Sequence, residues 1–213
     1  MMTGELNNTQ AISPRFEFRS FGREFDLVVE RMVQLSDPVP ERVRERQSEE
    51  IYIMSKYNNT NNTKIRYGLM DIKTLIRTVD GLEQWGPLMK AEFPVDSSIL
   101  ADHIFPALQA QLPVLDQEDY SLEDFLVIIS NNEILQAVNV NKHRFGYSVN
   151  GTICEMAMVE IDGNKVVTVA TESTDIDAVK KTISYLGLAG MENINYLQAI
   201  KRVVGMSDKP LAN

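Results

Sequence analysis

Charged and apolar residues alternate strictly in the segment "SPRFEFRSFG" near the start of the chain. Arg15, Glu17 and Arg19 share one parity, and Phe16 and Phe18 share the other. Successive side chains of a β-strand point to opposite faces, so a strand here would carry an Arg-Glu-Arg triplet on one face and two aromatic rings on the other. The triplet could lie in water, or it could face the inside of a closed sheet.

The same parity rule gathers more charged residues on one face of the later strands. The basic members of this set are Arg15, Arg19, Lys64, Arg66, Lys73, Lys142 and Arg144. The acidic members are Glu17, Asp71, Glu155 and Glu172. The set carries a net charge of +3. Since the whole chain carries −9, the remaining residues carry −12.

Two arrangements of these charged residues are possible. Cations that line a closed barrel repel one another, since two unit charges 4 Å apart interact by about 4 kcal/mol at an effective dielectric near 20. A polyphosphate bound among them would be held by charge-assisted hydrogen bonds, and the carboxylates could hold Mg²⁺ or Mn²⁺. On an open antiparallel sheet, the same face would simply be solvated.

The elements that must position these residues alternate in an α+β order. Strands are expected at residues 14–20, 47–54, 64–68, 69–78, 135–149, 151–161 and 165–173. Helices are expected at 23–36, 96–112 with a kink or break at Pro106, 120–130, 174–188 and 192–204. Residues 80–130 are expected to be helical and loop-rich. Asn150-Gly151 and Asp162-Gly163 predict hairpin turns, so the sheet should be mainly antiparallel.

Bulk composition limits the class of protein. No low-complexity linker divides the 213 residues, which predicts one domain over 14–205 after a flexible segment at 1–13. A single cysteine, Cys154, excludes an internal disulfide. The charge of −9 argues against non-specific binding to nucleic acid. No apolar run reaches the length of a membrane span, so a cytoplasmic protein is expected.

The order of the motifs resembles the CYTH superfamily, also called triphosphate tunnel metalloenzymes. That pattern opens with a strand Glu-x-Glu-x-Lys and a helix, followed by strands with a tyrosine, with paired basic residues and with a final lysine. A helical section, a strand with Lys-x-Arg, a hairpin and a strand with a late glutamate complete it. The corresponding segments here are "RFEFR", "EEIYI", "KIRYG", "MDIK", "KHR", "CEM" and "VATES", over roughly residues 15–188.

The resemblance implies an antiparallel barrel, or tunnel, of about eight strands flanked by helices. It implies that phosphate oxygens are bound by Arg19, Lys64, Arg66, Lys73, Lys142 and Arg144. It implies that Mg²⁺ or Mn²⁺ is held by Glu17, Glu155 and Glu172. It identifies no catalytic residue. Arg15 and Arg19 stand where the pattern has Glu and Lys, and an extra cation with one carboxylate fewer should weaken metal binding.

Three functions stay open at this point. In the first, the tunnel binds a small molecule that carries a triphosphate or polyphosphate and hydrolyses it with a divalent metal. In the second, it is a non-catalytic binding module for a phosphorylated ligand or a protein partner. In the third, the sheet is open, its charged face is solvated and the protein acts through protein interactions. The resemblance and the apolar helices also leave a homodimer open.

Overall fold

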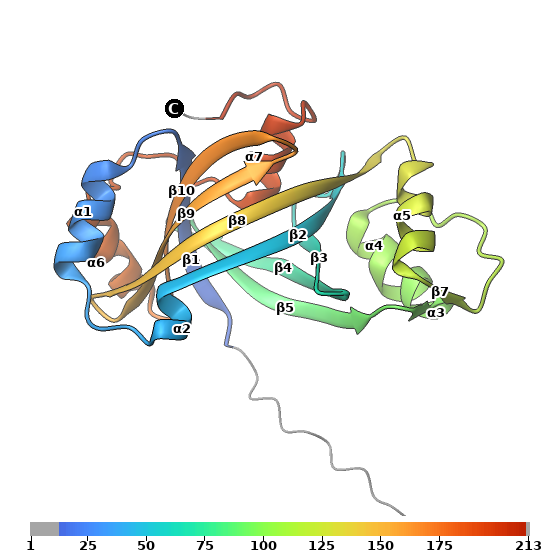
Figure 1. The fold of residues 1–213 in the computed structure, drawn as a ribbon, viewed down its shortest axis with the longest axis horizontal. Helices are drawn as coiled ribbons and strands as arrows, with labels where there is room; N and C mark the ends of the chain where they lie inside the picture. Colours follow the sequence, from blue (N-terminus) through green and yellow to red (C-terminus); the bar gives the residue numbers. More distant parts are fainter. Residues whose placement is uncertain (1–12, 212–213) are drawn as a thin grey trace, which may run out of the picture.

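Eight antiparallel strands close into a barrel in the computed structural model, which describes residues 13–211 (Figure 1). Around the barrel the order is β1-β10-β9-β8-β2-β3-β4-β5, and β5 pairs with β1 to close it. The strands are β1 (Arg15–Gly22), β2 (Glu45–Ser55), β3 (Asn61–Arg66), β4 (Leu69–Val79), β5 (Leu82–Glu92), β8 (Leu135–Val149), β9 (Thr152–Ile161) and β10 (Asn164–Ser173). The predicted closed tunnel is confirmed, and the open sheet is wrong. The predicted flexible segment 1–13 falls almost wholly outside the described residues.

Tight turns join consecutive strands of the barrel. Asn150 and Gly151 have φ angles of 52° and 72°, and Asp162 and Gly163 have 43° and 84°. Positive φ at both central residues gives the turn that matches the twist of the flanking strands. Both predicted hairpins are therefore confirmed, and they fix the register of β8, β9 and β10.

Strand β5 corrects the expectation that residues 80–130 are helical and loop-rich throughout. Its sequence, LEQWGPLMKAE, has no β-branched residue and carries Gly86 and Pro87 in its middle. Proline cannot donate to a strand ladder, so such a segment does not look like a central strand. The register of β4 and β5 shifts between Ile72 and Lys73 and again between Leu75 and Arg77, which accommodates the irregular segment.

A helical segment covers the outer face of β2, β3 and β4 at one end of the barrel (Figure 1). It consists of α3 (Ser97–Ile99), the π-helix η1 (Leu100–Ile104), α4 (Phe105–Leu108) and α5 (Leu122–Ser130), with a small sheet of β6 (Val95–Asp96) and β7 (Asp119–Tyr120). The irregularity predicted at Pro106 is confirmed as the π-helical turn before it, because proline has no N–H and crowds the preceding turn. A capping box formed by Ser121 and Asp124 begins α5.

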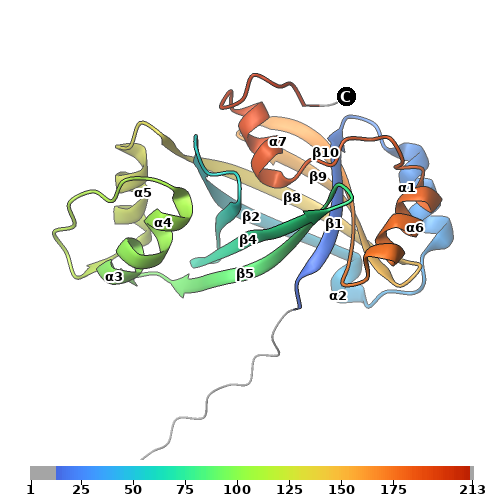
Figure 2. The ribbon, with the colours of Figure 1, turned by 180° about the vertical axis from the view of Figure 1, so that it is seen from behind.

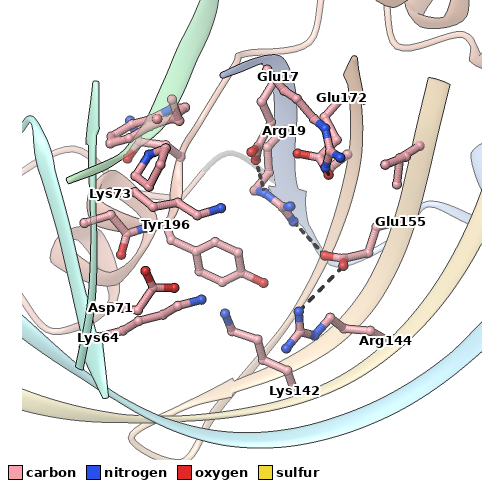
Figure 3. A pocket seen from close by; sticks show the side chains of 18 of the residues that line it. Glu17, Arg19, Lys64, Asp71, Lys73, Lys142, Arg144, Glu155, Glu172 and Tyr196 are labelled. Atoms are coloured by element: carbon pink, nitrogen blue, oxygen red, sulfur yellow. Dashed lines mark hydrogen bonds and ion pairs between the residues drawn. The ribbon is translucent and has the colours of Figure 1, made fainter. Parts of the chain in front are cut away.

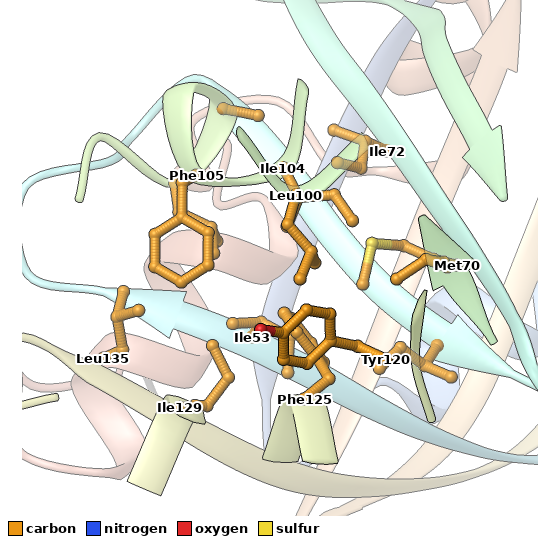
Figure 4. Packing of buried hydrophobic residues seen from close by; sticks show 14 residues of the cluster. Ile53, Met70, Ile72, Leu100, Ile104, Phe105, Tyr120, Phe125, Ile129 and Leu135 are labelled. Atoms are coloured by element: carbon orange, nitrogen blue, oxygen red, sulfur yellow. The ribbon is translucent and has the colours of Figure 1, made fainter. Parts of the chain in front are cut away.

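The apolar cluster under this segment joins it to the barrel (Figure 4). Ile53, Met70 and Ile72 are fully buried on the outward side of their strands. They pack against residues of the helical segment such as Leu100 and Phe125. The outward parity of these strands is therefore apolar, which leaves the opposite parity, with its charged residues, facing the inside of the barrel.

Two helices cover the other end of the barrel, where α1 (Asp26–Leu35) and α6 (Ile176–Leu186) pack on outward-facing residues of β1 and β9 (Figures 1 and 2). Cys154 is buried in this cluster. The N-cap of α6 is Asp175, whose side chain accepts from two backbone N–H groups.

Helix α7 (Tyr196–Val203) closes the barrel from within on one side (Figure 2). Its buried residues Tyr196, Leu197 and Ile200 share a cluster with inward-facing apolar side chains such as Tyr52 and Val140. This apolar plug ends where the charged lining begins. A further short helix, α2 (Glu41–Arg44), precedes β2. Within residues 13–211, no helix has the length and apolar character needed to cross a membrane.

Candidate functional site

A cavity of about 360 Å³ runs inside the barrel, and charged side chains line it (Figure 3). All the residues that strand parity gathers contribute to its wall. The basic ones are Arg15, Arg19, Lys64, Arg66, Lys73, Lys142 and Arg144. The acidic ones are Glu17, Asp71, Glu155 and Glu172. The structure thus brings the predicted phosphate-binding and metal-binding residues together in one cavity, while their roles stay predictions.

Three further charged residues belong to the site and were not predicted from the sequence. Arg46 and Lys90 line the cavity, and Glu50 contacts its cations from below the surface. Arg46 and Glu50 share the parity of Tyr52, so extending the parity rule along "ERQSEEIYI" would have found both. Lys90 lies on β5, which was not expected to be a strand.

Glu50 is a completely buried carboxylate at the centre of four cations. Its oxygens lie 2.8 Å from Lys142 Nζ and 3.0 Å from Arg144 Nη2. They lie 3.5 Å from Arg66 Nη1 and 3.7 Å from Lys64 Nζ. Burial alone would raise the pKa of Glu50, but the surrounding cations outweigh it and hold this pKa far below its ordinary range. Glu50 is therefore a permanent internal anion that holds four basic side chains in one place.

On the opposite wall, each of the three carboxylates forms an ion pair with an arginine. Arg19 donates from Nε to Glu17 at 2.6 Å and from Nη1 to Glu155 at 3.2 Å. Arg15 donates from Nη1 to Glu172 at 3.1 Å. Glu17 pairs directly with Glu172 across the two strands, so the arginines also separate like charges. Burial and the nearby Glu17 together raise the pKa of Glu172.

Aromatic rings form the closed end of the cavity, beside the apolar plug. The ring of Tyr196 lies 3.7 Å from Lys142 Nζ and 4.8 Å from Arg19 Cζ, measured to the ring centroid. Tyr52 stacks on Tyr196 and accepts a hydrogen bond of 2.6 Å from Lys142 Nζ. Cation–π contacts of this kind hold the charged heads of Lys142 and Arg19 against the plug. Figure 3 shows Tyr196 between Arg19 and the Lys64–Lys142 side of the wall.

Several polar atoms of the lining lack a hydrogen-bond partner among the described residues. Of five buried side-chain atoms without a partner, four belong to residues of the cavity wall. These four are Asn62 Oδ1, Asp71 Oδ1, Arg144 Nε and the hydroxyl oxygen of Tyr196. Buried polar atoms in proteins are nearly always hydrogen-bonded, so this concentration indicates a site that receives its partners from a ligand or solvent.

Like charges also face each other across the wall. Arg46 and Arg144 are directly opposite in the register of β2 and β8. Arg46 has no ion pair with another residue of the described part of the chain. Opposed like charges destabilise a sheet, so a bound anion near this pair would relieve a local cost.

The carboxylates as they stand do not fit a divalent metal ion. Glu17, Glu155 and Glu172 each accept from an arginine, and Arg19 lies between two of them. In residues 13–211, no group of three or more His, Cys, Asp or Glu side chains is arranged to hold a metal. A cation that entered here would meet guanidinium groups at the same oxygens.

His103 and His143 lie outside this site. His103 belongs to η1, in the helical segment. His143 faces outward from β8, and its Nε2 lies 2.6 Å from Glu45 Oε1.

Comparisons with known proteins found likenesses in structure only. No family model matches the chain, and no curated protein matches it. A conserved hypothetical protein from Pyrococcus furiosus is similar in structure at 15% identity and a TM-score of 0.45, covering 86% of this chain and 98% of its own. A putative adenylyl cyclase from Hippeastrum with a dominant triphosphatase activity has 9% identity and a TM-score of 0.46, covering 88% and 95%. A putative adenylate cyclase from Bacillus halodurans has 10% identity and a TM-score of 0.49, covering 88% and 98%.

The likenesses are too distant to assign a family or an activity. The strand pairing of this chain itself establishes the closed barrel. That barrel, with its charged interior and flanking helices, is the architecture that the resemblance to the CYTH superfamily predicts. The chain therefore has a closed, eight-stranded tunnel fold.

Proposed function

We propose that the tunnel binds the triphosphate or polyphosphate part of a small molecule. The observation that carries this proposal is the excess of cations in the cavity wall, where nine basic residues face four acidic ones. Glu50 adds one internal anion and leaves a net charge of +4. The cavity volume of about 360 Å³ falls at the lower end of the range for small-molecule sites.

The proposed phosphate contacts divide between the two sides of the wall. Arg144 has a buried Nε–H without a partner, and Lys73 has no ion pair within the described part of the chain. Arg46 and Lys90 also line the cavity without an ion pair in the described part of the chain, so all four side chains have donors available to a ligand. Lys64, Arg66 and Lys142 form ion pairs with Glu50, and each has further N–H donors for phosphate oxygens. Arg19 is proposed as a further contact at the closed end.

Of the two tunnel functions that the sequence leaves open, the arrangement favours binding without turnover. Phosphoryl transfer depends on positioning and on stabilising the developing charge, usually with a metal. The cations for positioning are present, whereas the carboxylates that would hold Mg²⁺ or Mn²⁺ are paired with arginines. Hydrolysis with a divalent metal is the second candidate, because those three carboxylates line the same cavity as the cations.

Calorimetric titration with inorganic tripolyphosphate tests the proposal. Saturable binding to the wild-type chain is expected, with a loss of tenfold or more in Arg144→Ala, since a hydrogen bond to a charged group contributes about 1.5–3 kcal/mol. Lys181→Ala is the matched control, because Lys181 is exposed on α6 and does not line the cavity. Folded wild-type protein that binds no tripolyphosphate, or an Arg144→Ala variant that binds as tightly, would overturn it.

Phosphate release separates the two candidates. Wild-type chain is incubated with tripolyphosphate and Mn²⁺ or Mg²⁺, beside Arg144→Ala. Release that disappears in the variant would establish hydrolysis in the tunnel. Binding without release would support the binding module.

A further inference from the structure

The three carboxylates of the tunnel already have cationic partners from the same chain. Glu17 and Glu155 share the guanidinium of Arg19, and Glu172 accepts from Arg15. Arg15 and Arg19 lie two residues apart on β1, so both side chains project into the cavity from one strand. The strand thereby supplies two positive charges at the carboxylates that a divalent ion would need.

We propose that Arg15 and Arg19 take the place of the divalent metal, so that the tunnel binds a phosphate-rich anion without Mg²⁺ or Mn²⁺. This inference rests on the proposed function, since it names how that same site neutralises its ligand. It concerns binding and includes no chemical step.

The positions of the two guanidinium groups support this assignment. Arg19 is buried, and its contacts with Glu17, Glu155 and Thr168 use Nε and Nη1. Its Nη2 makes no hydrogen bond with another residue among those described, and neither does Nη2 of Arg15. Each arginine is therefore fixed by a carboxylate on one edge and has N–H donors left on the other. A planar guanidinium with free donors matches the oxygens of a phosphate group.

Arg19 stays protonated beside Glu17 and Glu155, so no change of pH frees these carboxylates for a metal ion. Burial opposes the charge of this guanidinium, but Glu17 and Glu155 outweigh it and raise the pKa of Arg19 further. Arginine stays charged at every pH at which the protein is folded. A lysine at this position could lose its proton when buried, whereas Arg19 remains a cation beside the same oxygens.

Binding of Mn²⁺ alone provides the first measurement. The full-length chain is titrated with Mn²⁺ and free ion is followed by electron paramagnetic resonance. No saturable site is expected in the wild type. The double variant Arg15→Glu with Arg19→Lys adds a carboxylate and removes the planar bridge, and it should gain a site at least tenfold tighter than any wild-type binding. Arg23→Glu, which introduces a carboxylate at an exposed position after β1, is the matched control and should gain none.

The second measurement is a tripolyphosphate titration with and without metal. It uses the wild-type chain, so it tests the inference even if the double variant does not fold. Equal or tighter binding in EDTA than in excess Mn²⁺ is expected. Arg15→Gln, which removes one partly exposed cation, should weaken binding in EDTA by fivefold or more.

The outcomes separate the two proposals. Tripolyphosphate that binds only with Mn²⁺, or a saturable Mn²⁺ site in the wild type that Glu172→Gln removes, would overturn this inference and leave the proposed function standing. Tripolyphosphate that binds under neither condition would overturn the proposed function, and this inference with it.

Discussion

Replacing Glu50 with Gln should strongly destabilise the protein, because the change removes the one anion among four cations. The carboxylate is fully buried and lies within 3.7 Å of Lys64, Arg66, Lys142 and Arg144. Glutamine keeps the shape of the side chain and loses the charge. Removing one partner of a buried ion pair typically costs about 3–5 kcal/mol, and loss of the anion that four cations share places this site at the upper end. At 150–250 residues that corresponds to a fall in Tm of roughly 6–20 °C.

Urea unfolding followed by circular dichroism measures the change in the free energy of unfolding. The control is Glu45→Gln on the same strand, where Glu45 is largely exposed and pairs with His143 outside the barrel. An exposed pair contributes about 0–1 kcal/mol, so the control should stay near wild type. Tripolyphosphate at 100 times its dissociation constant should return about 2.7 kcal/mol to Glu50→Gln, because an anion again sits among the cations.

The pH dependence follows from the lowered pKa of Glu50. A depressed pKa in the folded state means that the stabilisation is complete above the unfolded pKa and is lost as the pH falls through the folded value. The difference in stability between wild type and Glu50→Gln should therefore be constant from about pH 8 to pH 5. It should narrow only below the unfolded value near 4.3. A difference under 1 kcal/mol at pH 7, or one equal to that of Glu45→Gln, would refute the view that Glu50 organises the cation cluster.

Three further predictions concern the tunnel and its supports. Tripolyphosphate should raise the Tm of the wild-type chain beyond a sodium chloride control of equal ionic strength, measured by scanning calorimetry. Asn195→Ala should cost about 0.5–2 kcal/mol in urea unfolding, because Asn195 caps α7 and its Nδ2 donates to Glu83 at 3.0 Å. Gly146→Ala should cost about 1–3 kcal/mol, since a Cβ there would lie 2.5 Å from a backbone carbonyl oxygen. Gly86→Ala should cost less, because the one close contact of its Cβ, at 2.7 Å, is with the end of the flexible Ile76 side chain. Equal costs at the two glycines would contradict this expectation.

Strand parity predicted the wall of the site well because it is a local property. Whether Lys64 and Arg66 face inward depends only on their own strand and on which parity is apolar. The hairpin turns were equally predictable, since Asn-Gly and Asp-Gly require the positive φ angles that the structure shows. The closure of the sheet came from the order of the motifs.

The pairing inside the cavity could not be predicted from one sequence. Glu50 meets Lys142 and Arg144 because of the register of β2 against β8, two strands separated by some 90 residues. Such a register depends on packing across the whole barrel. The same holds for the contacts of Arg19 with Glu155 and of Arg15 with Glu172, which decide whether the carboxylates are available. Strand β5 was missed for a local reason, since its Gly-Pro pair argues against a strand.

The distribution of charge reconciles an acidic chain with the proposed anion site. The cavity wall together with Glu50 carries a net charge of +4. Since the whole chain carries −9, the remaining residues carry −13. The outer field therefore repels extended polyanions such as nucleic acids, whose binding depends on many exposed basic contacts. A small phosphate-rich anion that reaches the interior meets buried cations in a low dielectric, where each contact is strong. The barrel wall thus separates two charge environments, and the proposed ligand is one small enough to pass from the outer to the inner one.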